Sequence, residues 1–267
     1  MPIRYLFAAC ALFFIASCST VPITGRSQLS LIPGSSMLSM SLSQYDTFLK
    51  EHKVSTDRAQ TDMVKRVGSR IQNAVERYFA SKGMSSRLAS YKWEFNLVED
   101  KEVNAWCMPG GKVVVYTGIL PVAQGETGLA VVLGHEISHA IAEHGNERMS
   151  QGLLAQFGGM ALAEALSAKP AATQQLWMTV YGVGAQYGAI LPYSRIQENE
   201  ADHLGLIFMA MAGYDPRESV TFWQRMSAQK GGNAPPEFLS THPADATRIE
   251  NIKGLIPEAM RYYNPGR

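Results

Sequence analysis

The organisation of this chain follows from one stretch, Leu129-Ala-Val-Val-Leu-Gly-His-Glu-Ile-Ser-His-Ala-Ile-Ala-Glu-His144. Within its helical apolar pattern, His135, Glu136 and His139 form an H-E-x-x-H motif. Positions i and i+4 share one face of a helix, so His135 and His139 can bind one metal ion. Glu136 lies about 100° around the helix from His135, within reach of a water on that metal. Two histidines and one carboxylate, with a position open to water, are the ligands of a catalytic zinc.

A second segment supplies the third ligand. Ser194 and Gln197 have the spacing of a capping box, which predicts that a helix starts here. Glu198 and Asp202 lie four positions apart and therefore share a face of that helix. We assign Glu198 as the third zinc ligand and Asp202 as the acceptor of a hydrogen bond from a ligand histidine. His203 is an alternative ligand, although it neighbours Asp202 and faces away from Glu198.

Length and charge limit the class of protein. The chain has 267 residues, with 24 Lys and Arg against 23 Asp and Glu. This balance excludes the basic field expected of a nucleic-acid-binding protein. We expect a signal peptide over residues 1–17, a lipidated tether over 18–34 and one zinc metallopeptidase domain over 35–267.

The first residues resemble a bacterial lipoprotein signal. Arg4 precedes an uncharged apolar run over residues 5–15, which is too short to span a bilayer. The run ends in Ile15-Ala-Ser-Cys18, which resembles a lipobox and predicts lipidation of Cys18. Ser19 resembles the sorting signal of outer-membrane lipoproteins. We therefore predict a lipid-anchored protein of the bacterial cell envelope, on the periplasmic side and at the outer membrane.

The pattern between these segments predicts an α+β fold. Apolar residues at steps of three and four indicate helices over 35–50 and 57–82. Alternation predicts a strand over 92–98, and residues 103–107 and 112–116 flank Met-Pro-Gly-Gly as a hairpin. The predicted fold is mostly helical and gluzincin-like, with a small β-sheet or hairpin beside the zinc-binding helix.

The sequence predicts where the zinc-binding helix ends and that two apolar runs follow it. The helix is expected from Gly125 to His144, with Gly145 in the C′ position that ends it. Two almost uncharged apolar runs follow, near residues 153–168 and 176–191. Each is shorter than a spanning helix, so we expect a helical hairpin that covers the catalytic cleft or rests on a membrane surface.

The metal motifs resemble a known family. His135-Glu-x-x-His139 followed by Glu198-x-x-x-Asp202 is similar to the membrane-associated zinc metallopeptidases. These include the CAAX prenyl proteases, the bacterial heat-shock protease HtpX and periplasmic quality-control lipoproteins. The resemblance covers the chain from Val21 to its end and implies an endopeptidase with one Zn²⁺ per chain. Prenyl-protein processing is not carried over, because the chain lacks the clear spanning helices of the integral-membrane members.

The resemblance also implies roles for residues outside the motifs. His242, followed by Pro243, matches a family histidine that stabilises the transition state or fills the open zinc position as a latch. Arg248 matches its supporting arginine. Peptidases with this helix commonly receive the substrate backbone on an edge strand, for which Asn104 and Ala105 are the candidates; the alternative is that both residues only form part of the sheet core.

Together these features predict a zinc endopeptidase acting on misfolded or unassembled cell-envelope proteins, with Glu136 as general base. One alternative is a periplasmic chaperone or assembly factor with latent or secondary protease activity. Another is a structural lipoprotein with a metal-stabilised core. The expected partners are protein substrates and a membrane reached through the lipid anchor, with no nucleic acid. The sequence does not predict an oligomeric state.

Overall fold

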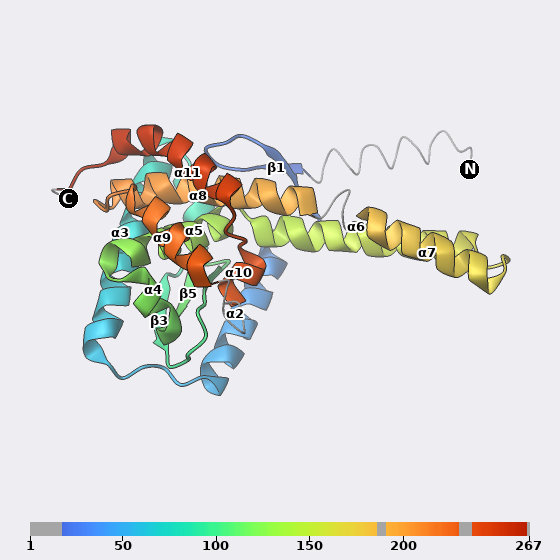
Figure 1. Cartoon of the computed structure of the whole chain (residues 1–267), viewed down its shortest axis with the longest axis horizontal. Coiled ribbons are helices and arrows are strands. Elements are labelled where there is room, and N and C mark those ends of the chain that lie inside the picture. Colours follow the sequence, from blue (N-terminus) through green and yellow to red (C-terminus); the bar gives the residue numbers. More distant parts are fainter. Residues whose placement is uncertain (1–17, 186–190, 230–236, 266–267) are drawn as a thin grey trace. The chain divides into compact units, whose positions relative to one another are not determined.

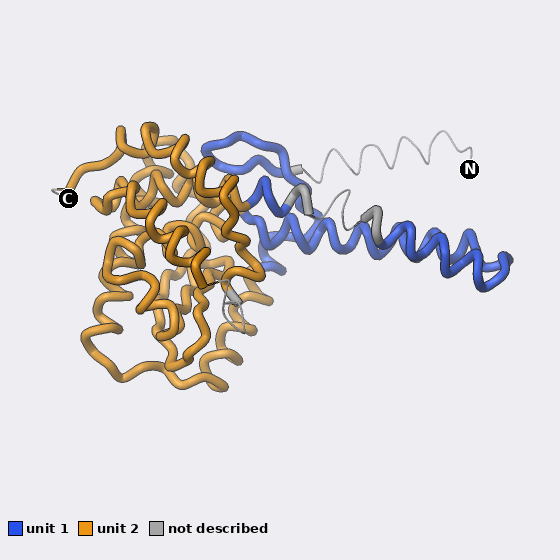
Figure 2. Tube along the Cα trace, in the orientation of Figure 1, with its two compact units in different colours: residues 1–37, 143–197 blue, residues 38–142, 198–267 orange. Residues whose placement is uncertain are grey.

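The computed structural model describes residues 18–185, 191–229 and 237–265, which form two compact units (Figure 2). Unit 1 comprises the chain up to Met37 and residues 143–197, and unit 2 comprises residues 38–142 and 198–267. The predicted class is confirmed, because helices predominate and the sheets are small (Figure 1). The domain boundaries placed after residues 17 and 34 stay predictions.

A three-stranded sheet lies at the centre of unit 2. It consists of β3 (Glu94–Val98), β4 (Ala105–Met108) and β5 (Lys112–Tyr116), in the order β3-β5-β4. The predicted hairpin is confirmed, since β4 and β5 pair antiparallel around the turn at Gly110 and Gly111. Both glycines have positive φ, which favours glycine in such a turn. β3 pairs with β5 in parallel.

Helices cover both faces of this sheet. On one face, Tyr45 and Phe48 of α2 (Gly34–Glu51) pack with Trp106 and Tyr116. On the other lies α3 (Arg58–Ser81), where Gly68 leaves room for the ring of Phe95. This layering follows from the strand period of two, which sends alternate side chains to opposite faces.

Helix α5 (Glu126–Ile141) holds the H-E-x-x-H motif and belongs to the core of unit 2. Its residues from Gly128 to Ile141 are all buried, as expected for a helix that is apolar on every side. The helix ends earlier than predicted. Glu143, and not Gly145, adopts the left-handed conformation (φ 59°) that breaks it, and α6 (His144–Ala165) begins at the next residue.

Helix α8 (Leu191–Met211) carries the second metal motif. The predicted capping box is wrong, because the chain is already helical at Leu191, three residues before Ser194. The Gln197 side chain instead donates to a carboxylate oxygen of Glu147 at 2.7 Å. The remaining helices include η1 (Ser85–Leu88), η2 (Thr117–Ile119), α4 (Leu120–Ala123), α9 (Glu218–Ala228), α10 (Glu237–Thr241), α11 (Ala246–Ala259) and η5 (Met260–Tyr262).

In unit 1, the stretch predicted as a tether forms an ordered hairpin of β1 (Cys18–Thr20) and β2 (Ser27–Leu29). Buried polar side chains of α6 bind this segment. Arg26 makes two bonds of 2.7 and 2.8 Å to the Glu147 carboxylate, and Asn146 donates to the Ile32 carbonyl. Sequence periodicity does not reveal such partners, because they are more than a hundred residues apart.

The predicted apolar hairpin is formed by α6 and α7 (Ala171–Ala185). The two helices approach at Gly158, and Tyr181 donates a hydrogen bond to the Ala155 carbonyl at 2.8 Å. Phe157 and Trp177 are among its exposed apolar side chains. Across the described residues, none of the helices has both the length and the apolar character needed to cross a bilayer.

Candidate metal centre

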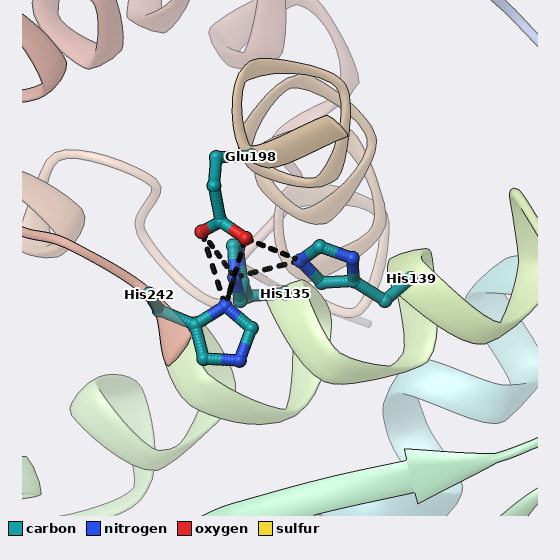
Figure 3. A group of neighbouring side chains, drawn as sticks. All are labelled: His135, His139, Glu198 and His242. Atoms are coloured by element: carbon teal, nitrogen blue, oxygen red, sulfur yellow. Dashed lines mark hydrogen bonds and ion pairs between the residues drawn. The ribbon is translucent and has the colours of Figure 1, made fainter. Parts of the chain in front are cut away.

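Three separate segments of unit 2 bring four metal-binding side chains together (Figure 3). His135 and His139 come from α5, Glu198 from α8, and His242 from the residue that follows α10. One donor atom from each residue lies within 4.8 Å of the others. All four side chains are buried, so their polar atoms face one another rather than bulk water.

The distances show how tightly these atoms converge. The Nε2 atom of His135 lies 3.1 Å from His139 Nε2 and 3.1 Å from His242 Nδ1. Glu198 places its carboxylate oxygens 3.4 Å from His135 Nε2 and 3.3 Å from His139 Nε2. Both oxygens lie 3.0 Å from His242 Nδ1. The predicted ligands therefore converge on one point, and His242 faces it from the other side (Figure 3).

The donor set fits a zinc ion. Imidazole nitrogens and a carboxylate are the ligands of catalytic zinc sites, which keep one position for water or substrate. Apposed imidazole nitrogens at 3.1 Å cannot all be satisfied by one another, because a neutral ring offers a single N–H donor. A cation at their common centre would satisfy all of them. His135, His139 and Glu198 would hold it, and His242 stands at the fourth position.

The neighbouring charges shift the pKa of these groups. Burial lowers the pKa of His135, but hydrogen bonds to Asp202 and Glu198 outweigh burial and raise it to about 9. Burial raises the pKa of Glu198, but the charge of His139 and the hydrogen bonds from the histidines outweigh burial and hold it well below its ordinary value. The site therefore keeps its carboxylate ionised in a buried position.

Asp202 and Arg248 hold two of the predicted ligands in place through hydrogen bonds and ion pairs. Asp202 lies 3.0 Å from His135 Nδ1, so it accepts from the ring nitrogen that does not face the centre. Arg248 donates from Nε and Nη2 to the two Asp202 oxygens, each at 2.8 Å. Its Nη1 atom also lies 3.0 Å from Glu198 Oε2. Sequence reasoning placed Asp202 beside a ligand histidine, and the structure shows that this histidine is His135.

Two aromatic residues of the site have no signal in the sequence. The guanidinium carbon of Arg248 lies 3.5 Å from the centre of the Trp223 ring, which fixes the arginine by a cation–π contact. Trp223 also stacks on Phe238, and Phe238 lies 4.7 Å from the His242 ring, centre to centre. Both aromatic side chains are fully buried. Their positions on short helices far along the chain carry no motif that points to a metal site.

Glu136 lies beside the ligand set without being part of it. It follows His135 on α5 and is buried, and its Oε1 atom lies 3.5 Å from His242 Nε2. A carboxylate in this position can accept a proton from a water at the centre of the site.

The edge strand β4 directs some of its backbone groups away from β5, beside this site. Tyr116 N–H donates to the Asn104 carbonyl, so Asn104 directs its backbone to β5. In an antiparallel ladder the direction alternates, so Ala105 and Cys107 direct their backbone groups to the open edge of β4. The Asn104 side chain accepts from the Ala105 N–H at 2.9 Å. Of the two predicted edge residues, Ala105 therefore presents its backbone outward and Asn104 does not.

A family model matches residues 66–256, and its description is Peptidase family M48. This match spans both metal motifs and His242. The chain belongs to peptidase family M48.

Curated relatives agree with this assignment. The mitochondrial metalloendopeptidase OMA1 of Saccharomyces cerevisiae is 30% identical over 97% of this chain and 74% of its own length. Its namesake from Schizosaccharomyces pombe is 38% identical over 71% of this chain and 53% of its own length. A putative beta-barrel assembly-enhancing protease of Vibrio cholerae is 32% identical over 64% of this chain and 35% of its own length. The predicted class of metalloendopeptidase is confirmed.

The names of these M48 relatives contradict the predicted location. The relatives that match over most of the chain are named as mitochondrial, so the predicted location at the bacterial outer membrane is wrong. That prediction depended on a few residues around Cys18, most of which lie outside the described part of the chain. Cys18 itself lies in β1, and its lipidation stays a prediction.

Neither the alternative ligand His203 nor the cysteine of β4 belongs to the metal cluster of this M48 site. His203, the alternative ligand, lies 3.0 Å from Glu258 of α11 through Nε2 and takes no part in the cluster. Cys107 of β4 is half-buried. Burial and the nearby Glu136 raise the pKa of its thiol well above the ordinary value, which disfavours the thiolate needed for nucleophilic catalysis.

Proposed function

We propose that this member of family M48 hydrolyses internal peptide bonds of unfolded or unassembled proteins with one zinc ion held by His135, His139 and Glu198. The observation that carries the proposal is the convergence of these donor atoms within 4.8 Å, with Glu136 buried beside them. A structural metal site would need the ligands but would have no use for this carboxylate.

The chain's own residues supply the proton transfers. A zinc ion held here would polarise the scissile carbonyl and lower the pKa of an adjacent water. Glu136 accepts a proton as the water oxygen bonds to the carbonyl carbon. It then delivers this proton to the amide nitrogen as the carbon–nitrogen bond breaks. Asp202 holds the His135 ring in one orientation by accepting from its Nδ1 atom, at 3.0 Å.

The substrate class follows from the edge of β4. The outward carbonyl of Ala105 and the outward backbone groups of Cys107 can pair with a chain in extended conformation, and the Ala105 N–H can join them once it leaves the Asn104 side chain. Folded proteins rarely offer such a chain, whereas unfolded or unassembled ones do. The names of the relatives include a beta-barrel assembly-enhancing protease, which favours the same class of substrate.

We further propose that His242 acts as a latch in the resting chain. Its Nδ1 atom lies 3.0 Å from both Glu198 oxygens and 3.1 Å from His135 Nε2, where a fourth ligand would stand. A site with four protein ligands leaves no position for water. Cleavage then requires His242 to move aside when substrate binds.

The test compares cleavage of an unfolded protein, such as reduced casein, by the wild-type chain and by Glu136→Gln, with the zinc content of both. We expect one zinc per chain in each and cleavage by the wild type alone. Glu250→Gln is the matched control, because Glu250 is exposed and pairs only with Lys253 among the contacts described. Cleavage by Glu136→Gln at the wild-type rate would overturn the assigned mechanism.

The latch has its own test. His242→Ala should keep zinc through the other three ligands and cleave casein faster than the wild type. A slower rate with zinc retained would contradict the latch and would assign His242 to stabilisation of the transition state.

A further inference from the structure

The two helices that carry the metal ligands touch backbone to backbone at one pair of glycines. Gly134 of α5 precedes His135, and Gly205 of α8 follows Glu198 by seven residues. A Cβ atom on Gly134 would lie 2.9 Å from the Gly205 carbonyl oxygen. A Cβ atom on Gly205 would lie 2.9 Å from Gly134 C and 3.0 Å from His135 N. The crossing therefore has no room for any side chain at either position.

The spacing along α8 places this contact on the metal-binding face. Glu198, Asp202 and Gly205 occupy positions i, i+4 and i+7, which follow one face of a helix. The same face thus carries the predicted ligand, the carboxylate that orients His135, and the glycine that touches the backbone of His135. The closeness of α5 to α8 at this crossing determines how far His135 lies from its partners on α8.

The separation between α5 and α8 is more critical here than in a core without a metal site. His135 Nε2 lies 3.4 Å from Glu198 Oε2, and its Nδ1 lies 3.0 Å from Asp202 Oδ1. Metal–ligand distances vary by only about 0.2 Å between working sites. An added methyl group would force the helices apart by more than this, since neither helix backbone can rotate away as a flexible side chain can.

We propose that Gly134 and Gly205 are positioning residues that set the geometry of the zinc site. This inference rests on the proposed zinc peptidase. The competing interpretation is that the two glycines only allow close packing and have no particular effect on the metal.

Two other helical glycines of unit 2 separate these interpretations. Gly128 lies on α5 seven residues before His135, and its added Cβ would lie 1.9 Å from the Ala123 carbonyl oxygen. Gly128→Ala therefore introduces a backbone clash on the same helix about 10 Å from the ligand. Gly254 lies on α11 with no atom within 4 Å of the added Cβ, so Gly254→Ala introduces none.

The experiment measures the zinc dissociation constant of each folded full-length variant by competition with a chelator. The absorption spectrum of the cobalt-substituted form reports on ligand geometry. We expect Gly205→Ala and Gly134→Ala to bind zinc at least tenfold more weakly and to change the cobalt spectrum. Gly128→Ala should lose thermal stability but bind zinc within about twofold of the wild type. Gly254→Ala should bind zinc like the wild type and lose no thermal stability, because alanine favours a helix over glycine.

Two results would overturn the inference while leaving the peptidase intact: wild-type zinc affinity in folded Gly205→Ala, or an equal loss of affinity in Gly128→Ala. If Gly205→Ala fails to fold, Gly134→Ala tests the same contact from the other helix. Absence of zinc binding by the wild type itself would instead refute the proposed function, and this inference with it.

Discussion

Replacing Asp202 with Asn tests how the metal centre is supported. Asp202 is buried, accepts two hydrogen bonds of 2.8 Å from Arg248 and lies 3.0 Å from His135 Nδ1. Burial raises the pKa of this carboxyl, but Arg248 and His135 outweigh burial and keep it below its ordinary value. Asn keeps the shape, removes the charge and replaces one of the two acceptor oxygens with an NH₂ donor, so the substitution removes both the charge and one accepted hydrogen bond.

The expected magnitude has two parts. Loss of a carboxylate behind a ligand histidine lowers metal affinity about 10- to 100-fold. Loss of one partner of a buried ion pair costs about 3–5 kcal/mol of unfolding free energy. In this variant Arg248 keeps its contacts with Glu198 Oε2, at 3.0 Å, and with the Trp223 ring, so we expect a loss of about 3 kcal/mol, the lower end of that range.

Chelator competition measures the zinc affinity of Asp202→Asn, and urea unfolding of the metal-free chain measures its stability. The control is Asp215→Asn, because Asp215 forms an exposed ion pair with Arg217 in the same unit. Such pairs contribute about 1 kcal/mol or less, and zinc affinity should not change. If Asp202→Asn bound zinc as tightly as Asp215→Asn does, the assigned role of Asp202 would be refuted.

Two further predictions concern the substrate edge and unit 1. Ala105→Pro removes an N–H that points away from β5 and that a bound substrate would take over from the Asn104 side chain. β4 should still pair with β5, while KM for an extended peptide rises about 2- to 10-fold from one lost hydrogen bond. An unchanged KM would contradict substrate binding at this edge. Arg26→Met leaves the Glu147 carboxylate buried without its arginine, so the Leu31 amide, which donates to Ser150 at 2.9 Å, should exchange faster with deuterium. Equal exchange rates would show that the ion pair does not hold the hairpin.

The sequence predicted those parts of the site that depend on local geometry. His135 with His139, and Glu198 with Asp202, are pairs at i and i+4, and the helix period alone places each pair on one face. The β4–β5 hairpin was equally local, because Gly110 and Gly111 stand at its turn. The same reasoning could not find Trp223, since the cation–π contact with Arg248 joins two helices without a common motif.

Other errors arose where a distant partner decided the local structure. Gln197 was predicted to cap its own helix but donates to Glu147, fifty residues earlier in the chain. Glu143 ends α5 by adopting the left-handed conformation that glycine usually takes, and Gly145 lies inside the next helix. Local patterns identify residues that can cap or end a helix, and tertiary contacts determine which of them do so.

The metal centre depends both on local helix patterns and on contacts between distant parts of the chain. Each helix brings its own residues to one face, but no spacing within α5 or α8 determines the distance between those faces. That distance is determined where Gly134 meets Gly205, at a contact that neither helix encodes alone. His242 adds a donor that lies 107 positions beyond His135. The motifs therefore identify the ligands, whereas the contact between the two glycines determines whether the ligands can hold a metal together.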